Sequence, residues 1–385
     1  MNGDPGGYRR LARKMLLVTG AALAAVALFN YLVNPFDVWS SRLVHSKFIK
    51  SGRDRVSPAY ASSAQSPVHT VLVGTSRTRN GFAMEPPVLD GVLNAGIPAG
   101  ALIETAEVVQ ACAQRSDVKL ILWEAAFFNF GTLWSAEAEP MIVRRIQGDP
   151  TLMAAETLFS GLAVKTSYRK LLRSIRGLRR EDSWPVPWNK EHLEQMAQAM
   201  RRGFREESFN VRFAVRGYVR KMPDYEFVSE RMERLQERVS AAVQQGKRVE
   251  FYIPPVTEYH LEAIRQGGQW PLFMRWKRQL ADIAPVWDFC GYHELARDLP
   301  LFRDANHFAA PVGWAMFHVM TEGDDPAELG ALSLVREAAD RLDPTTADGL
   351  LAEQTRAMQE RRATGGKYQQ LVEELSRTLA AGEGP

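Results

Sequence analysis

Short apolar runs alternate with amphipathic segments along most of this chain, and this alternation restricts the fold more than any other feature. Each run is too short for a buried helix and leads into glycine, proline or polar residues. The pattern predicts strands over residues 71–73, 92–97, 120–123, 249–253 and 286–289. Amphipathic spacing predicts helices over residues 103–113, 227–243, 272–283 and 311–320. Such an alternation is typical of an α/β fold with a parallel sheet covered by helices on both faces.

The N-terminal region contains an apolar stretch long enough to cross a membrane. Residues 15–33 carry no charge, and at a rise of about 1.5 Å per residue they span roughly 28 Å. Four basic residues within 9–14 precede this stretch, so the positive-inside rule leaves the N-terminus in the cytoplasm and sends the rest across the membrane. A cleaved signal peptide is the alternative. The bulky residues at 30–36 make a poor cleavage site, which favours a retained transmembrane anchor.

The remaining segments complete the predicted domain organisation. Residues 1–36 form the cytoplasmic N-terminus and anchor, and residues 37–67 are an irregular linker. The α/β domain follows over 68–325, interrupted from about 140 to 225 by a mostly helical insertion. Residues 326–385 are polar and helix-prone, and predict accessory helices with a frayed tail.

The predicted insertion is rich in arginine, and this charge has two interpretations. One is a set of solvated helix faces. The other is a surface for anionic lipid headgroups or an acidic polysaccharide, within reach of a membrane-tethered domain. The segment Trp184–Trp188 fits either stacking on sugar rings or a packed loop. The arginines are Arg144, Arg145, Arg169, Arg173, Arg176, Arg179, Arg180, Arg201, Arg202, Arg205, Arg212, Arg216 and Arg220.

Charge and cysteine content narrow the possible functions. A net charge of +3 over 385 residues gives no case for nucleic-acid binding. Cys112 and Cys290 have no metal-ligand spacing and form no Cys-x-x-Cys pair, and both lie in apolar segments. They are interpreted as buried, inert thiols rather than as a disulfide. No metal or organic cofactor is indicated.

Two segments more than two hundred residues apart carry the groups of a serine hydrolase. Ser76 directly follows the first predicted strand, and Asp304 precedes His307 by three residues ahead of the last predicted helix. The carboxyl ends of parallel strands meet at one edge of a sheet, so these residues are expected to come together there. A hydroxyl, an imidazole and a carboxylate are the set that activates a serine nucleophile. The alternative is that Ser76 belongs to a plain turn, Asp304 caps the next segment and His307 is a structural loop histidine.

These motifs and their order resemble the SGNH (GDSL-like) hydrolase superfamily, in its membrane-anchored bacterial branch. Gly-Thr-Ser-Arg at 74–77 is similar to the nucleophile motif, Asn-Ala-Gly-Ile-Pro-Ala-Gly at 94–100 to the second motif, and Asp-Ala-Asn-His at 304–307 to the last. The resemblance covers roughly residues 68–320 outside the insertion, and it implies a flavodoxin-like three-layer α/β/α sandwich. Further similar segments are 251–255 and 287–292.

The resemblance implies a role for each residue of the set. Ser76 would attack an ester carbonyl, His307 would take the serine proton, and Asp304 would hold the imidazole in the required tautomer. The backbone N–H groups of Ser76 and Gly96 would stabilise the oxyanion, and the loss of one such donor typically costs about a hundred-fold or more in rate.

The chain departs from the family pattern after the third strand. Many SGNH enzymes place an asparagine there as a further oxyanion donor, whereas this chain has Glu124 and Ala125. Either Asn129 serves from the following loop, or the oxyanion hole has fewer donors. Candidate substrate-binding residues are Arg77, Glu124 and His260, with pairing to a surface acid as the alternative for Arg77.

The expected function is a serine-dependent O-acyl esterase or O-acyltransferase, acting on O-acetyl groups of a cell-envelope or exported glycan. The resemblance and the anchor together imply a single-pass protein of the bacterial inner membrane with its catalytic domain in the periplasm. A membrane acyltransferase or a polysaccharide assembly is the expected kind of protein partner. The alternative function is a catalytically silent module that binds a glycan or an envelope partner. A lipase or thioesterase acting on membrane acyl chains also fits the anchor.

Overall fold

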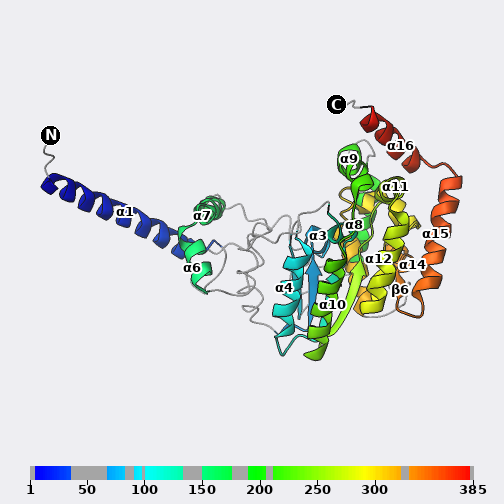
Figure 1. Cartoon of the computed structure of the whole chain (residues 1–385), viewed down its shortest axis with the longest axis horizontal. Coiled ribbons are helices and arrows are strands. Elements are labelled where there is room, and N and C mark those ends of the chain that lie inside the picture. Colours follow the sequence, from blue (N-terminus) through cyan, green and yellow to red (C-terminus); the bar gives the residue numbers. More distant parts are fainter. Residues whose placement is uncertain are drawn as a thin grey trace. The chain divides into compact units, whose positions relative to one another are not determined.

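The computed structural model describes residues 5–35, 67–82, 91–97, 100–132, 150–175, 190–204, 211–321 and 329–381. The chain divides into two units, one of residues 1–63 with 140–185 and one of residues 64–139 with 186–385 (Figure 1). The predicted linker lies outside the described residues except for its last position. Trp184–Trp188 and the arginines at 144, 145, 176, 179, 180 and 205 also lie outside them.

The second unit is built on a six-stranded sheet in the order β2-β1-β3-β4-β5-β6. The first five strands are parallel, so the mixed α/β class and the five predicted strands are confirmed. The sixth strand runs antiparallel to β5. The strands are β1 (Thr70–Gly74), β2 (Val92–Gly96), β3 (Leu120–Glu124), β4 (Arg248–Ile253), β5 (Val286–Asp288) and β6 (Asp340–Leu342).

Both faces of the sheet carry buried side chains, which explains why its strands are apolar throughout rather than alternating. On one face, Leu72 and Tyr252 belong to a large core that includes Met316 of the helix following the Asp-x-x-His segment. On the other face, the indole Nε1 of Trp123 donates a hydrogen bond to Thr105 Oγ1 at 3.2 Å. The sheet is therefore a buried layer whose carboxyl edge presents the loops that carry the candidate site.

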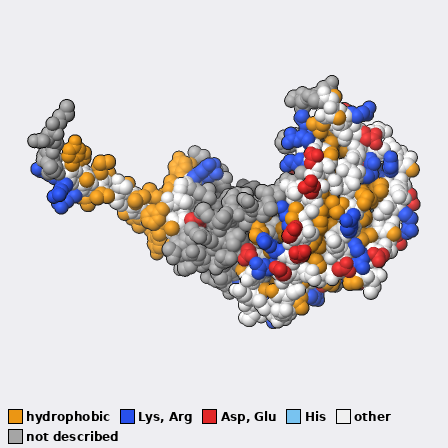
Figure 2. Space-filling model, in the orientation of Figure 1, with side chains coloured by type: hydrophobic (Ala, Val, Ile, Leu, Met, Phe, Trp, Pro, Cys, Tyr) orange, Lys and Arg blue, Asp and Glu red, His pale blue; other side chains and the backbone are white. Residues whose placement is uncertain are grey.

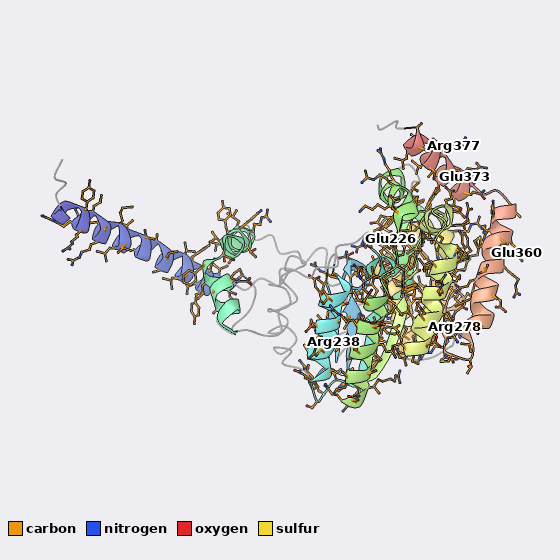
Figure 3. All side chains as sticks on the ribbon, viewed as in Figure 1. Glu226, Arg238, Arg278, Glu360, Glu373 and Arg377 are labelled. Atoms are coloured by element: carbon orange, nitrogen blue, oxygen red, sulfur yellow. The ribbon has the colours of Figure 1, made fainter. Side chains whose placement is uncertain are left out.

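The four predicted helices are all present, as α4 (Leu102–Ala113), α10 (Ser229–Gln244), α12 (Trp270–Ile283) and α13 (Ala310–Thr321). The exposed Glu360 and Arg377 mark outward faces of the C-terminal helices (Figure 3). Among the described residues, the other α-helices of this unit are α3 (Ser76–Gly81), α8 (Lys190–Gly203), α9 (Val211–Lys221), α11 (Glu258–Gln266), α14 (Ser333–Glu337), α15 (Ala347–Ala363) and α16 (Lys367–Ala380). Its 3₁₀ turns are η2 (Phe127–Phe130), η5 (Met222–Asp224), η6 (Glu294–Arg297), η7 (Leu299–Leu301) and η9 (Gly330–Leu332).

The C-terminal region was expected to hold only accessory helices, and that expectation is corrected by strand β6. A buried polar cluster joins this region to the sheet. The ammonium of Lys277, which is fully buried, contacts Asp288 Oδ2 at 2.6 Å and Gln354 Oε1 at 2.8 Å. The amide of Gln354 also donates to Asp340 Oδ2 at 2.8 Å. Because a buried charge is costly without its partners, and Gln354 of α15 (Ala347–Ala363) is one of them, this C-terminal helix is an integral part of the unit.

The first unit contains the N-terminal helix α1 (Pro5–Val33) with α6 (Pro150–Phe159) and α7 (Gly161–Ile175). Residues Gly7–Val33 of α1 are long and apolar enough to cross a membrane, and an 18-residue stretch within them has a mean hydropathy of 2.1. Hydrophobic side chains cover most of its surface (Figure 2). The predicted insertion is helical in its described parts. Its helices are divided between the two units, since α6 and α7 belong to the first unit and α8 and α9 to the second.

Candidate active site

The turn after β1 presents a serine at the carboxyl edge of the sheet. Thr75 has extended backbone angles and caps α3, and its Oγ1 accepts a hydrogen bond from the Arg77 N–H at 3.4 Å. Ser76 is the first residue of α3 and is partly exposed. A strand that ends in a capped helix thus holds the Ser76 hydroxyl outward from a buried layer.

The Asp-x-x-His segment forms a tight loop between η7 and α13. A β-bridge joins Phe302 to Phe308, and the Arg303 N–H donates to His307 O at 2.8 Å. Within the loop, Asp304 Oδ1 accepts hydrogen bonds from the backbone N–H groups of Asn306 and His307, each at 3.0 Å. The short side chain of aspartate allows this local arrangement, which orients its carboxylate toward the imidazole.

The structure brings Ser76, His307 and Asp304 together in a continuous chain of hydrogen bonds. Ser76 Oγ lies 2.8 Å from His307 Nε2, although the two residues are 231 positions apart. His307 Nδ1 lies 2.8 Å from Asp304 Oδ2 and 2.9 Å from Oδ1. The side chains of His307 and Asp304 are 24% and 39% exposed, so a dissolved substrate can reach the set. This is the geometry that serine acyl transfer requires.

The electrostatics of the loop keep the Asp304 carboxylate ionised. Partial burial is the largest single influence and acts to raise the pKa of Asp304. The hydrogen bond from His307 and the backbone hydrogen bond from Asn306 outweigh burial, so the pKa of Asp304 lies below its ordinary value. The carboxylate can therefore stabilise a proton taken up by the imidazole.

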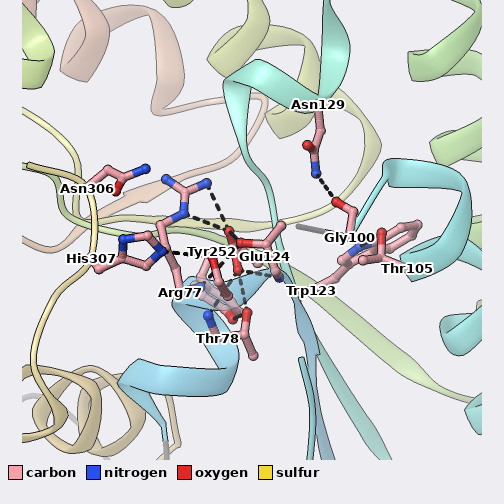
Figure 4. Close-up of polar contacts among 12 residues, drawn as sticks. Arg77, Thr78, Gly100, Thr105, Trp123, Glu124, Asn129, Tyr252, Asn306 and His307 are labelled. Atoms are coloured by element: carbon pink, nitrogen blue, oxygen red, sulfur yellow. Dashed lines mark hydrogen bonds and ion pairs between the residues drawn. The ribbon is translucent and has the colours of Figure 1, made fainter. Parts of the chain in front are cut away.

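Glu124 lies beneath the nucleophile turn and not at the surface (Figure 4), which corrects its expected place among the substrate-binding residues. Its carboxylate is fully buried and accepts hydrogen bonds from the Thr75 N–H and Oγ1, both at 2.8 Å. It also accepts from the Thr78 N–H at 3.2 Å and from the Thr78 hydroxyl. Tyr252 Oη lies 2.6 Å from Thr78 Oγ1 and completes this layer. Glu124 thus organises the turn that carries Ser76.

Arg77 supplies the charge that balances this carboxylate. Its Nε and one terminal nitrogen each lie 2.9 Å from Glu124 Oε1, and its side chain is only 9% exposed. Burial alone would raise the pKa of Glu124, but the charge of Arg77 and the hydrogen bonds from Thr78 outweigh it and lower the pKa. Arg77 was expected either to bind substrate or to pair with a surface acid. It pairs with an acid, but this acid is buried.

Gly74 leaves the space in which this layer forms. A Cβ at position 74 would lie 1.9 Å from Thr78 Oγ1 and 2.4 Å from Glu124 Oε2. No side chain fits there without displacing the hydrogen bonds under the turn. The motif Gly-Thr-Ser-Arg requires a glycine at its first position because Thr78 of α3 and Glu124 of β3 both approach the backbone of Gly74 closely.

The predicted oxyanion donors differ in what they contact. The Ser76 N–H has no acceptor among the described residues, so it is open toward a ligand. The Gly96 N–H donates to Asn94 Oδ1 at 3.0 Å, and Asn129 Nδ2 donates to Gly100 O at 3.3 Å. In this conformation Gly96 is therefore not an open donor, and Asn129 is tied to the loop after β2 (Figure 4).

Asn94 is a positioning residue that the sequence interpretation overlooked. Its amide Nδ2 donates to Phe82 O at 2.7 Å and to Thr78 O at 3.1 Å, so it joins β2 to the end of α3. An asparagine within an apolar strand is the signal that points to it, because strands seldom contain asparagine. These hydrogen bonds hold β2 close to α3. A side chain at position 96 would not fit between them, because a Cβ there would lie 2.5 Å from the Arg79 backbone nitrogen.

His260 lies in a buried aromatic cluster beside the site. Its ring centroid is 4.4 Å from that of Tyr218 and 5.0 Å from that of Phe128, and its Nδ1 has no hydrogen-bond partner among the described residues. The Tyr218 hydroxyl accepts a hydrogen bond from the amide of Asn306. Burial, with a smaller effect from the charge of Arg77, lowers the pKa of His260 to about 3. The ring is therefore neutral and packed, which corrects its expected role in direct substrate binding.

The buried ring of His260 predicts a specific pH dependence of stability. As the pH falls below about 6.5, the unfolded chain binds a proton at this residue that the folded chain does not bind, so stability falls until the pH nears about 3. When the pH is lowered from 7 to 5, the unfolding free energy of both proteins should fall. We expect the fall to be about 2 kcal/mol smaller in His260→Phe than in the wild type. Urea unfolding of the full chain in detergent at both pH values measures this difference.

The exposed His69 provides the control for that experiment. His69→Gln should change the pH dependence of the unfolding free energy far less than His260→Phe does, because its side chain is exposed. Identical pH dependences of the wild type and His260→Phe would show that His260 is not held in its neutral form.

Neither thiol takes part in the site. Cys112 and Cys290 are free and buried, and burial raises the pKa of each to about 12, which confirms the expectation of inert thiols. The described parts of the chain contain no cluster of three or more His, Cys, Asp or Glu side chains with the arrangement of a metal site.

Comparisons with known proteins do not place this chain in a family. No family model, curated protein or solved structure matches it. The class defined by the fold and the site alone is an α/β protein with a Ser-His-Asp arrangement at the carboxyl edge of a mostly parallel sheet.

Proposed function

We propose that this protein is a serine-dependent acyl-transfer enzyme, an O-acyl esterase or O-acyltransferase. The observation that carries the proposal is the contact of Ser76 Oγ with His307 Nε2 at 2.8 Å, backed by Asp304 on the other ring nitrogen. The alternation of strands and helices and the three motifs that resemble the SGNH hydrolase superfamily support the same class.

The proposed reaction proceeds through an acyl-enzyme. Ser76 Oγ attacks the ester carbonyl while His307 Nε2 takes the hydroxyl proton, and Asp304 stabilises the resulting imidazolium. The Ser76 N–H donates to the oxyanion of the tetrahedral intermediate. The alcohol then leaves with the proton from His307, and water or an acceptor hydroxyl attacks the acyl-serine by the same route in reverse. Hydrolysis and acyl transfer differ only in this last acceptor.

The N-terminal helix supports a site of action at a membrane. The apolar length of α1 and the basic residues before it favour a single span with the second unit on the far side of the inner membrane. A tethered esterase there would meet lipid-linked or exported glycans, and O-acetyl groups on such glycans are the proposed substrates. A preference for long acyl esters over acetyl esters in a substrate panel would favour the lipase or thioesterase alternative.

Labelling with a fluorophosphonate probe, read by intact mass on the full chain in detergent, tests the proposal. The wild type should gain one adduct, Ser76→Ala should gain none, and His307→Ala should react at least about a hundred-fold more slowly. Ser229→Ala, at an exposed serine of α10, is the control and should label like the wild type. Absence of an adduct on a folded wild-type protein would contradict an activated serine.

A second candidate function is a catalytically silent module that binds a glycan or an envelope partner. The observation that favours it is the internal hydrogen bonding of Gly96 and Asn129, which leaves fewer open oxyanion donors than the family pattern implies. An unlabelled but folded protein that still binds an acylated glycan would support this candidate.

A further inference from the structure

Helix α1 makes a polar contact within its apolar stretch. Asn30 lies three residues before the end of the helix at Val33, and its side chain is fully buried. Its Nδ2 donates to Leu158 O at 2.9 Å, and its Oδ1 accepts from Ser167 Oγ at 2.8 Å. A polar side chain inside a membrane-spanning segment is costly unless its groups have partners. Here both groups of the amide are satisfied by α6 and α7.

The helices α6 and α7 form a short hairpin against this end of α1. They are joined through Ser160, whose Oγ accepts the Ala163 N–H at 3.0 Å and caps α7. The buried side of the hairpin carries the small residues Thr157, Ala163 and Ser167 together with Glu156. Small side chains allow close helix packing where the surroundings give no hydrophobic drive between helices. The hairpin therefore packs on α1 in the manner of helices within a membrane.

The opposite side of the hairpin is apolar and basic together. Phe159 is 51% exposed and Tyr168 is 57% exposed, although both are large aromatic residues. Lys165 and Arg169 are exposed one turn apart on α7, beside Tyr168. Aromatic rings with neighbouring cations are typical of surfaces at the level of phospholipid headgroups.

The position of the contact along α1 gives the depth of the hairpin. The uncharged stretch 15–33 measures roughly 28 Å, which matches the thickness of a bilayer core. Asn30 lies about 5 Å inside its end. Helices attached there lie at the boundary between lipid and water on the side where α1 leaves the membrane.

We propose that the α6–α7 hairpin is an interfacial element that binds the phospholipid surface and is fixed to the anchor by Asn30. Phe159 and Tyr168 enter the region between headgroups and acyl chains, and Lys165 and Arg169 meet lipid phosphates. Leu28 and Tyr31 near the end of α1 are exposed, as are Phe159 and Tyr168 on the hairpin, and for this reason we take a bilayer as the partner of this surface. The inference rests on the membrane span of α1 in the proposed function, and it does not depend on catalysis.

Nitroxide labels on the full chain in phosphatidylethanolamine–phosphatidylglycerol nanodiscs test this placement. Cysteine is introduced in turn at Phe159, Tyr168, Val18 in α1 and Glu360 in α15. Cys112 and Cys290 are buried, so the introduced thiol is the reactive one. Power saturation then compares collisions with oxygen, which concentrates in lipid, against collisions with a water-soluble nickel chelate. We expect the oxygen-to-nickel ratios at Phe159, Tyr168 and Val18 each to exceed that at Glu360 several-fold.

The outcomes separate the hairpin from the anchor. Ratios at Phe159 and Tyr168 equal to that at Glu360, with Val18 in lipid, would overturn the interfacial hairpin and leave the span of α1 intact. A water-exposed label at Val18 would overturn the span and the inference with it. The fluorophosphonate experiment reports on the serine site in either case.

The variant Asn30→Leu tests the contact that fixes the hairpin. It removes both hydrogen bonds while keeping α1 apolar, so the label at Phe159 should shift several-fold toward the nickel chelate. Leu28→Ala, at an exposed position of the same helix, is the matched control and should leave the label unchanged. An unchanged label in Asn30→Leu would overturn the role of Asn30.

Discussion

Replacing Asp304 with asparagine is expected to lower kcat for an activated ester about ten-thousand-fold, with KM within a few-fold of the wild type. Asparagine keeps the shape of the side chain, but its amide group facing His307 Nδ1 favours the tautomer that carries its proton on Nε2. That tautomer cannot take the proton of Ser76, 2.8 Å away. Steady-state hydrolysis of 4-nitrophenyl acetate by the full chain in detergent measures the effect.

A variant of the neighbouring residue and a double variant control this experiment. The side chain of Arg303 is exposed, and only its backbone N–H holds the loop, so Arg303→Gln should stay within about twofold of the wild type. Ser76→Ala combined with Asp304→Asn should be no slower than Ser76→Ala alone, because residues of one catalytic unit are not additive. A folded Asp304→Asn protein within about tenfold of the wild type would contradict the proposed role of Asp304.

The sheet and the meeting of Ser76 with His307 follow from features that act locally in the sequence. Apolar runs followed by turn residues mark parallel strands, and parallel strands place their carboxyl ends at one edge. This logic joins two segments 231 positions apart without any knowledge of their contacts. It does not find β6, because a strand of three residues that begins Asp340-Arg341 has no apolar run.

The contacts of Glu124 and Gly96 could not be predicted from the sequence for a different reason. A carboxylate after a strand suggests a residue that faces the ligand, and a glycine after a strand suggests an open N–H. Glu124 is held by partners from another segment, Arg77 and Thr78, whereas the Gly96 N–H is held by Asn94, two residues before it in the same strand. Periodicity identifies which residues reach the edge of the sheet. It does not identify which of them hydrogen-bond to one another and are therefore unavailable to a ligand.

Glu124 is expected to have the largest effect on the candidate site of any residue that does not touch substrate. Glu124→Ala should cost about 3–5 kcal/mol of unfolding free energy, because it leaves the guanidinium of Arg77 buried without its partner. It should also lower kcat about a hundred-fold with little change in KM, since the Thr75 and Thr78 N–H groups that fix the serine turn lose their acceptor. Urea unfolding and ester hydrolysis on the same preparations measure the two effects.

A less buried ion pair gives the matched control for Glu124. Glu107 accepts from Arg238 at 2.7 Å, and the side chains of Arg238 and Glu107 are 29% and 12% exposed. Such partly solvated pairs contribute little, so Glu107→Ala should cost about 1 kcal/mol or less and leave kcat unchanged. Equal losses of unfolding free energy and of kcat in Glu107→Ala and Glu124→Ala would contradict the proposed role of Glu124 in holding the serine turn.

Removing both partners separates the stabilising role of the pair from its role in positioning Ser76. In Arg77→Met with Glu124→Leu no buried charge is left unpaired, so much of the stability lost in Glu124→Ala should return. The N–H groups of Thr75 and Thr78 would still lack an acceptor, so kcat should stay about a hundred-fold low and fluorophosphonate labelling of Ser76 should stay slow. Recovery of kcat together with stability would mean that Glu124 only balances the charge of Arg77. Recovery of stability alone would assign to Glu124 the positioning of Ser76.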